Sequence, residues 1–435
     1  MKSKNNTFVR SVQLNNKYVN QSKKDVLALF LEHYRIAMVN YIDYFWNHHN
    51  LDGNYTSSDL NKQKYYPYSS KVNNDSILSG RALKCAASQA MGMINSAISK
   101  QSDRYHRLRS IQESDNPDKR QISNLQRKIH KTKLVKPTVP KNVSATLDSN
   151  NSIIHDTTNT SFDMCIELKS LFHKDYKYLT PNNDNKLPLL MKTHRRYWHW
   201  FNNPNSKRTN SILINKKGIS IRFKVTKSKK KRGIKVAIDQ GIKTCITAID
   251  INGEYQQSDV NNHDYDLEQI CKIMVNKTKG TNSYKKAQDH RRNYVNWCIN
   301  QLNLDPYNEL VLEHVYNIGY KSISSEFLKK FPTQIIKDKL QSTCEEKGVL
   351  FSLQTSAYRS QRCSDCGFVH SRNRKAKMFI CTSCGFSEDS DINAAANHLV
   401  VLPDIDRYLI AGINKSTGFY WNPMFDGVYT PISVV

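Results

Sequence analysis

Four cysteines in the last third of the chain have the spacing of ligands to a single metal ion. They form two CxxC pairs, Cys363 with Cys366 and Cys381 with Cys384, and 14 residues separate the pairs. Two such pairs are typical of a zinc ribbon, in which four thiolates close a tetrahedral site. Because four thiolates leave no position open for water, the pattern predicts structural rather than catalytic zinc.

Three acidic residues form a second candidate site. Asp239 ends the apolar segment "VAID", Glu313 ends "LVLE", and Asp391 opens an alanine-rich segment after the second cysteine pair. Carboxylates at the ends of neighbouring strands and on a facing helix can converge to hold two divalent ions about 4 Å apart around a phosphate. Oxygen ligands favour Mg²⁺ or Mn²⁺ over zinc. The three acids therefore indicate metal-assisted hydrolysis of a phosphodiester.

Each of these acids also has a structural explanation. Asp239 precedes a glycine and can shape a turn, while Glu313 can face solvent from its strand. Asp391 can cap the following helix, and Asp389 competes for that role. Taken singly, each acid fits its structural explanation better, but their joint order and context favour the catalytic one.

Basic residues are concentrated in the first half of the chain. Residues 1–232 hold 42 Lys and Arg against 16 Asp and Glu, whereas residues 233–435 hold 23 against 22. This asymmetry suggests that the first half binds a phosphate backbone. A generally basic, solvated surface is the alternative, and it does not predict so sharp a division.

Two basic segments are candidates for nucleic-acid contacts, namely the linker 226–233 and the loop between the cysteine pairs. Alternatively, the linker is only a solvated connection between domains, and the loop between the cysteine pairs is only a solvated loop tip. The candidate residues are Lys229, Lys230, Lys231, Arg232, Arg372 and Arg374.

The apolar periodicity predicts helices in the first half and an α/β layer in the second. Apolar residues recur at helical spacing over 25–46, and helices are also expected over 78–100 and 119–133. Alternating residues after "NKKG" predict a hairpin near 211–225. From residue 233, strands alternate with helices after those hairpin strands, which fits an RNase H-like layer.

The expected compartment is inferred from the lack of a signal peptide or a membrane-spanning segment in the sequence. The first residues carry no apolar run that would make a signal peptide, and no stretch approaches the roughly 20 apolar residues of a membrane span. The protein is expected to be soluble and cytoplasmic, associated with the nucleoid through DNA, or nuclear if it comes from a eukaryote or its virus. The six cysteines outside the CxxC pairs are then expected in the core rather than in disulfides.

The motifs around these residues resemble those of a known family, the TnpB transposon-associated nucleases and the compact type V CRISPR effectors. "VAIDQGIKT", "LVLEHVYNIG" and "DSDINAAANHL" are similar to the three RuvC motifs of that family. "TSAYRSQRCSDCG" with "FICTSCG" is similar to its inserted zinc ribbon. The motifs resemble those of the family over about residues 233–400. Before residue 233, only the expected order of domains is similar. Ser390 departs from the Asp-Arg-Asp that the family often has in its third motif, and the tail "GFYWNPMFDGVYTPISVV" matches no segment of it.

The resemblance implies an α/β RNase H-like (RuvC) nuclease domain with an inserted zinc ribbon, preceded by a wedge β-barrel that a helical recognition module interrupts. The implied boundaries are 1–22 and 151–232 for the wedge and linker, 23–150 for the helical module, 233–357 for the nuclease, 358–387 for the ribbon, and 388–435 for the third motif and tail. The implied activity is RNA-guided cleavage of double-stranded DNA beside a short flanking motif, with a guide RNA as partner. Asp239, Glu313 and Asp391 are the implied catalytic acids and ligands of Mg²⁺ or Mn²⁺.

Two other functions fit parts of the sequence. A catalytically inactive RNA-guided repressor shares this architecture, although the presence of all three acids argues against it. The second alternative is an RNase H-like transposase or resolvase that acts without RNA. A zinc ribbon between the second and third acids is not expected in such an enzyme.

Overall fold

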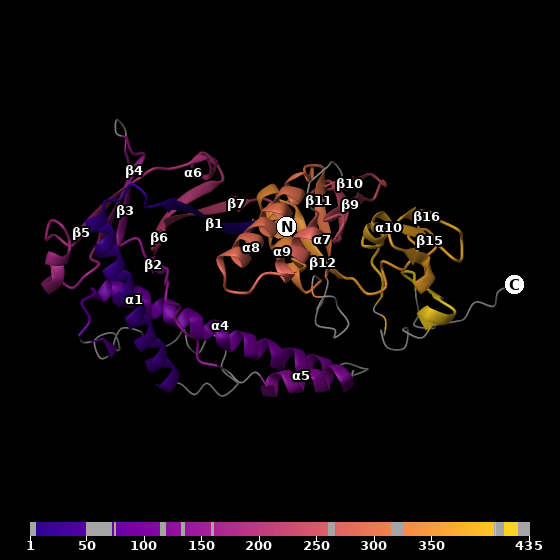
Figure 1. Cartoon of the computed structure of the whole chain (residues 1–435), viewed down its shortest axis with the longest axis horizontal. Helices are drawn as coiled ribbons and strands as arrows, with labels where there is room; N and C mark the ends of the chain where they lie inside the picture. Colours follow the sequence, from indigo (N-terminus) through magenta and orange to yellow (C-terminus); the bar gives the residue numbers. More distant parts are fainter. Residues whose placement is uncertain are drawn as a thin grey trace. The chain divides into compact units, whose positions relative to one another are not determined.

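The computed structural model describes residues 6–48, 72–113 except 74, 119–131, 135–157, 161–259, 266–314, 326–403 except 327, then 405 and 413–424. The chain divides into two compact units, Phe8–Val225 and Thr226–Val435, the latter joined by residues 1–7. Each unit is described by itself below, and Figure 1 labels the elements. In the described part, no helix is both long and apolar enough to cross a bilayer.

The unit Phe8–Val225 combines long helices with two antiparallel sheets. One sheet has the strand order β1-β7-β6-β2 and the other β3-β4-β5. Its elements are β1 (Asn6–Asn15), α1 (Gln21–His48), α4 (Gly80–Gln112), α5 (Lys119–Lys131), β2 (Ala145–Leu147), β3 (Ser152–Asp156), β4 (Met164–Lys169), η1 (Lys174–Leu179), β5 (Lys186–Met191), α6 (Arg195–Phe201), β6 (Ser206–Asn215) and β7 (Gly218–Lys227). The closed wedge barrel remains a prediction, since these strands form two separate sheets.

Helix α1 forms where the apolar periodicity predicted it. The residues at three- and four-residue spacing lie almost completely buried, so the stripe is core. They are Phe30, Tyr34, Met38, Tyr41 and Phe45. Helix α4 begins after its N-cap Ser79, whose Oγ accepts a hydrogen bond from the Ala82 amide at 3.1 Å. Helix α4 continues beyond the predicted end at residue 100. Its polar second half packs along α5, and these contacts stabilise the extension.

The predicted hairpin is formed by β6 and β7. Its turn ends at Gly218, whose φ is +149°, and a Cβ built there meets the Leu14 carbonyl oxygen at 1.9 Å. Only glycine therefore allows β7 to pair with β1 at this point.

The unit that follows residue 225 contains a five-stranded mixed sheet in the order β10-β9-β8-β11-β12. Strands β8, β9 and β10 pair antiparallel, whereas β11 runs parallel to both β8 and β12. This is the α/β layer predicted from the sequence. Its elements are β8 (Ile234–Gln240), β9 (Ile246–Asp250), β10 (Tyr255–Gln257), α7 (Leu267–Val275), α8 (Asn282–Asn300), β11 (Tyr307–His314), η2 (Leu328–Lys330), α9 (Thr333–Lys347) and β12 (Leu350–Thr355).

The smaller elements after β12 carry the cysteines and the last acid. Two short sheets, β14-β15-β16 and β13-β17, precede and flank a helix. They are β13 (Phe368–Val369), η3 (Ser371–Asn373), β14 (Arg374–Lys375), β15 (Met378–Ile380), β16 (Ser387–Asp389), α10 (Ser390–Asn397) and β17 (Phe419–Tyr420).

The two faces of the five-stranded sheet have different partners. Val236, Ile238 and Leu312 belong to the core shared with α7, α8 and α9. Helix α10 instead contacts β8 and β9, where Ile392 packs with Ile249. Because side chains alternate along a strand, the residues after Ile238 and Leu312 point away from the first core and towards the α10 side.

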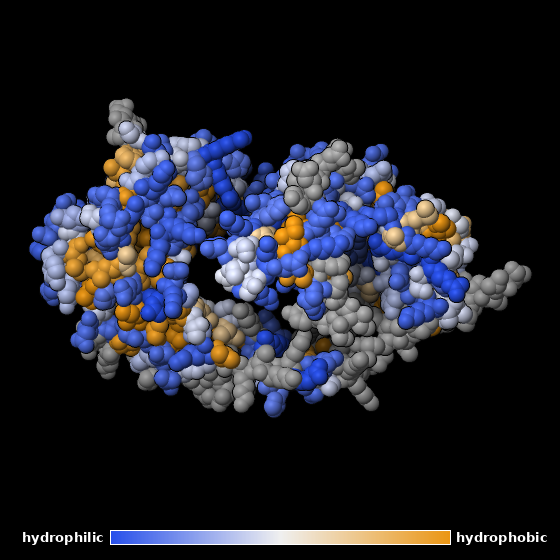
Figure 2. Space-filling model, in the orientation of Figure 1, coloured by the Kyte–Doolittle hydropathy of each residue, from blue (hydrophilic) through white to orange (hydrophobic). Residues whose placement is uncertain are grey.

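The surface is mostly hydrophilic in the face that Figure 2 shows, with apolar residues confined to patches. This agrees with a charged fraction of 24% and a mean hydropathy of −0.65. Of the six cysteines outside the CxxC pairs, Cys245, Cys271, Cys298 and Cys344 are buried and confirm the expected core role. Cys85 and Cys165 are half-buried free thiols.

Two glycine substitutions in the unit Phe8–Val225 are expected to change stability in opposite directions. Gly218→Ala forces a Cβ into the Leu14 carbonyl and should lower the free energy of unfolding by about 2 kcal/mol or more. Gly92→Ala lies within α4 with open space around it, and should raise that free energy by about 1 kcal/mol. Urea unfolding of the full chain measures both. Equal effects of the two changes would contradict the close approach at Gly218.

Candidate active site and zinc ribbon

Asp239 and Glu313 lie side by side at the carboxyl ends of two parallel strands. The register of β8 and β11 pairs Ile238 with Leu312, so the next residue on each strand is one of the acids. Both side chains are nearly buried, Asp239 at 8% residue exposure and Glu313 at 11% side-chain exposure. The structure therefore brings together two acids that are 74 positions apart in the sequence.

This placement makes both carboxyl groups difficult to ionise without a cation. Burial, followed by repulsion from Asp391, raises the pKa of Asp239 to about 7. Burial and then repulsion from Asp239 raise the pKa of Glu313 well above its ordinary value. The Gln240 amide, which donates to Glu313 Oε1 at 3.3 Å, opposes this shift. A divalent ion would relieve both the desolvation and the repulsion.

Asp391 lies in the first turn of α10, nearly buried, and its two oxygens are paired with cations. Arg374 Nη2 lies 3.1 Å from Oδ1, and Lys377 Nζ contacts Oδ2. Lys377 also donates to Thr244 Oγ1 at 2.8 Å. The helix N-cap is Asp389, which accepts from the amides of residues 391 and 392. Asp391 is therefore not needed as a cap, and its side chain is available for another role.

A histidine that the sequence analysis did not single out joins the first two acids. One ligand atom from each of Asp239, Glu313 and His398 lies within 4.8 Å of the others, a group found among the described residues. His398 is the C-cap of α10 and is 1% exposed. Burial lowers its pKa to about 3, so its imidazole is neutral. No spacing rule for metal ligands links a histidine to acids on two distant strands, so only the fold reveals it.

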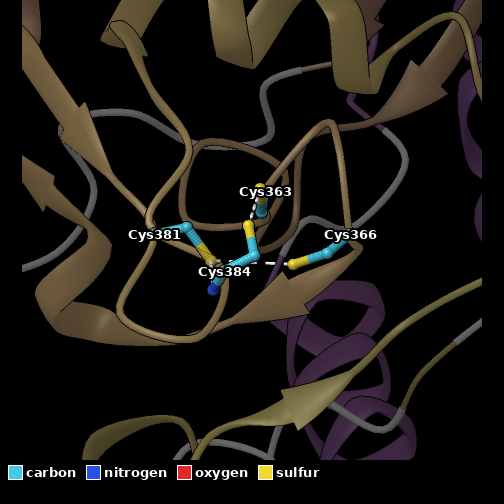
Figure 3. A group of neighbouring side chains, drawn as sticks. All are labelled: Cys363, Cys366, Cys381 and Cys384. Atoms are coloured by element: carbon cyan, nitrogen blue, oxygen red, sulfur yellow. Dashed lines mark hydrogen bonds between the residues drawn. The ribbon is translucent and has the colours of Figure 1, made fainter.

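The four cysteines converge as the spacing predicted (Figure 3). Cys363 Sγ lies 3.7 Å from Cys384 Sγ, and Cys366 Sγ lies 3.6 Å from Cys381 Sγ. Zinc–sulfur bonds of about 2.3 Å in a tetrahedron place sulfurs about 3.8 Å apart, so the group fits this ion. Burial raises the pKa of the Cys363 thiol to about 11, so a cation is needed to hold it as thiolate.

The two halves of this site are matching turns. Gly367 and Gly385 follow the second cysteine of each pair and adopt φ of +83° and +76°. The amide of each glycine donates at 3.0 Å to the carbonyl of the first cysteine, Cys363 or Cys381. The left-handed glycine is what lets each turn close around its sulfurs.

Hydrogen bonds join the first cysteine turn to the helix that carries Asp391. Asn393 and Asn397 of α10 donate to the Arg362 carbonyl at 2.9 and 2.7 Å. Asn393 Oδ1 also accepts from the Ser364 amide at 2.9 Å. Strand β16, paired with β15, leads directly into the helix. Ser390, where the family motif often has Arg, is fully buried and donates to the Ala376 carbonyl.

The tail segment 418–424 has a structural role that the sequence did not suggest. Strand β17 pairs with β13, and Trp421 is fully buried. Its carbonyl accepts from Arg362 Nε at 2.7 Å, and its indole donates to the Pro403 carbonyl. The rest of the quoted tail lies outside the described residues, as do residues 315–319 of the second motif.

The residues proposed to contact nucleic acid have mixed surroundings. Lys229, Lys231 and Arg232 of the linker and Arg372 of the ribbon are exposed. Lys230 is half-buried and donates to the Asp305 carbonyl at 2.6 Å, and Arg374 is held by Asp391. Nucleic-acid contacts of these residues remain a prediction.

The region that contains the cysteines and Asp391 is similar to known proteins. Residues 334–398 match the family model described as Cas12f1-like, TNB domain. The CRISPR-associated endodeoxyribonuclease Cas12f1 of Sulfoacidibacillus thermotolerans is 29% identical over 30% of this chain and 30% of its own length. A putative transposase, A625R of Paramecium bursaria Chlorella virus 1, is 27% identical over 41% of this chain and 45% of its own. The chain thus spans less than half the length of these relatives.

Among solved structures, a Cas12f1 chain from a complex with sgRNA and target DNA covers 90% of this chain and 98% of its own, at 15% identity and a TM-score of 0.43. The family match ends at His398 and so includes both cysteine pairs, Asp391 and the histidine. Together with the relatives, it confirms that the chain resembles the TnpB and compact type V effector family.

Proposed function

We propose that this protein is an RNA-guided DNA endonuclease whose single active centre consists of Asp239, Glu313 and Asp391. The observation that carries the proposal is the pairing of two nearly buried carboxylates on adjacent parallel strands, beside a helix that presents the third. Such a cluster has no evident structural use, because burying like charges together is costly. The carboxyl ends of strands are also where open α/β sheets bind their ligands.

The oxygen donors of these acids fit Mg²⁺ or Mn²⁺. Two such ions would activate a water molecule and stabilise the leaving oxygen of the phosphodiester. Asp239, which repels both Asp391 and Glu313, would serve as a ligand to both ions. The Gln240 amide holds the Glu313 carboxylate in a fixed orientation. Arg374 and Lys377 neutralise Asp391, and a metal ion at Asp391 would compete with these two contacts.

The nucleic-acid partners of this proposal rest on charge and on the relatives. The first 232 residues carry the excess of basic residues that a guide RNA and its DNA target require. Two of the relatives are CRISPR-associated endodeoxyribonucleases. Pairing with the guide reads the target sequence, while the protein reads a short flanking motif. A wedge, a helical module and the domain boundaries given above belong to this proposal.

Loss of the third acid is expected to stop cleavage without affecting RNA binding. Asp391→Ala should slow DNA hydrolysis in Mg²⁺ by about 10³-fold or more, because a metal centre supplies several kcal/mol and each 1.36 kcal/mol is tenfold. Single-turnover cleavage and RNA filter binding are the measurements. Glu388→Ala is the matched control, since Glu388 is exposed three residues earlier and should leave the rate unchanged. Undiminished cleavage by Asp391→Ala would remove this residue from the centre.

Loss of the cysteine site is expected to remove zinc and misplace Asp391. Cys381→Ser should lower the zinc content from about one ion per chain to near zero, because three thiolates hold the ion poorly. Cleavage should fall with the zinc content, since the first cysteine turn is hydrogen-bonded to α10. Elemental analysis and a cleavage assay measure the two. Cys165→Ser, a half-buried thiol outside the ribbon, should change neither. Full cleavage by a zinc-free Cys381→Ser protein would show that the ribbon does not position the acid.

A further inference from the structure

His398 is a buried imidazole with no hydrogen bond among the described residues. Its Nδ1 is buried without a partner, and its Nε2 lies 3.9 Å from Glu313 Oε2, too far for a hydrogen bond. The neighbouring Arg359 donates to the carbonyls of Thr355, Asn397 and Val400 rather than to the ring. Leaving a polar side chain buried without a partner is unfavourable, so a ligand at this position would explain why the histidine is there.

His398 and Asp391 lie on the same side of α10, at opposite ends of the helix and about 10 Å apart along its axis. Seven residues separate the two, which is nearly two full helical turns, so both lie on one face of the helix. The helix packs on β8 and β9, where Ile392 contacts Ile249. The imidazole reaches Glu313 at the end of β11 from this helix.

The distance from His398 to Glu313 matches two ligands of one ion rather than a hydrogen bond. With bonds of about 2.1 Å, two ligand atoms of one ion lie about 3.0 Å apart when adjacent and about 4.2 Å apart when opposite. The 3.9 Å from Nε2 to Glu313 lies in this range. Asp239 offers an oxygen to the same group, whose largest separation is within 4.8 Å.

We propose that His398 is a metal ligand through Nε2, completing with Asp239 and Glu313 one of the two ion sites of the active centre. This inference rests on the proposed function, because it concerns an ion that those two carboxylates would hold. An imidazole nitrogen suits first-row transition metals, whereas Mg²⁺ is bound by oxygen donors. The centre is therefore selective for Mn²⁺ over Mg²⁺ to a degree that carboxylates alone do not give.

The test is the binding of Mn²⁺ to the full-length, zinc-loaded protein, followed by titration and by pulsed EPR. The wild type should show a ¹⁴N coupling from a directly bound imidazole. His398→Leu should lose this coupling and bind Mn²⁺ on the order of 10- to 100-fold more weakly, a loss that even removal of an outer-shell partner of a ligand can produce. Its affinity for Mg²⁺ should fall less. Leucine of similar volume removes an unsatisfied polar group, so its unfolding midpoint without Mn²⁺ should not fall.

Two further variants separate the possible failures. His290→Gln, on the exposed side of α8, should retain the coupling and the affinity. Glu313→Gln should weaken binding of both ions. If the wild type binds Mn²⁺ through Glu313 but shows no ¹⁴N coupling, or if His398→Leu binds Mn²⁺ unchanged, the histidine is not a ligand and the carboxylate centre stands. If Glu313→Gln also binds both ions unchanged, the proposed active centre fails with it.

Discussion

The mutual repulsion of carboxylates at the ends of β8 and β11 is the constraint on which the rest of the site depends. Asp239 and Glu313 are adjacent, nearly buried and further repelled by Asp391. Low-dielectric surroundings strengthen this repulsion, so the cluster persists in its ionised form only with cations nearby. Arg374 and Lys377 provide two positive charges at Asp391. The other two acids lack such an ion pair with a lysine or arginine among the described residues, and in the proposed function divalent ions would neutralise them.

The cysteine cluster, whose geometry fits zinc, is connected to the same site. Its first turn is hydrogen-bonded to Asn393 and Asn397, and its last strand continues into the helix that carries both Asp391 and His398. The same small ribbon supplies Arg374 and Lys377. The ribbon and the helix after it thus carry one acid, its two neutralising cations and the histidine, while the five-stranded sheet carries the other two acids.

The sequence predicted the α/β layer, the cysteine cluster and the pairing of two acids because each depends on local signals. Apolar runs define β8 and β11, and a side chain at the end of each run must lie near its neighbour once the strands pair. The CxxC spacing carries its own geometry in the same way. No local signal predicted that the Arg374 side chain would point inward and pair with Asp391, since a basic loop residue ordinarily faces solvent.

His398 and Trp421 were missed for a related reason. The histidine matters only because α10 sets it against the end of β11, and the tryptophan because β17 pairs with β13 far earlier in the chain. Both are long-range contacts that no periodicity or motif spacing encodes. The wedge barrel, in contrast, was an inference from family architecture, and the two separate sheets of the unit Phe8–Val225 do not test its closure.

The central claim, guidance by RNA, is tested most directly by the nucleic acid that the protein binds. The gene should be expressed with its native flanking DNA, the protein purified, and the associated RNA sequenced. A discrete RNA with a constant scaffold and one locus-derived end is the predicted result, and it supplies the target for cleavage assays. Only random fragments, or no RNA at all, would contradict guidance and leave the carboxylates in a nuclease that finds its DNA unaided.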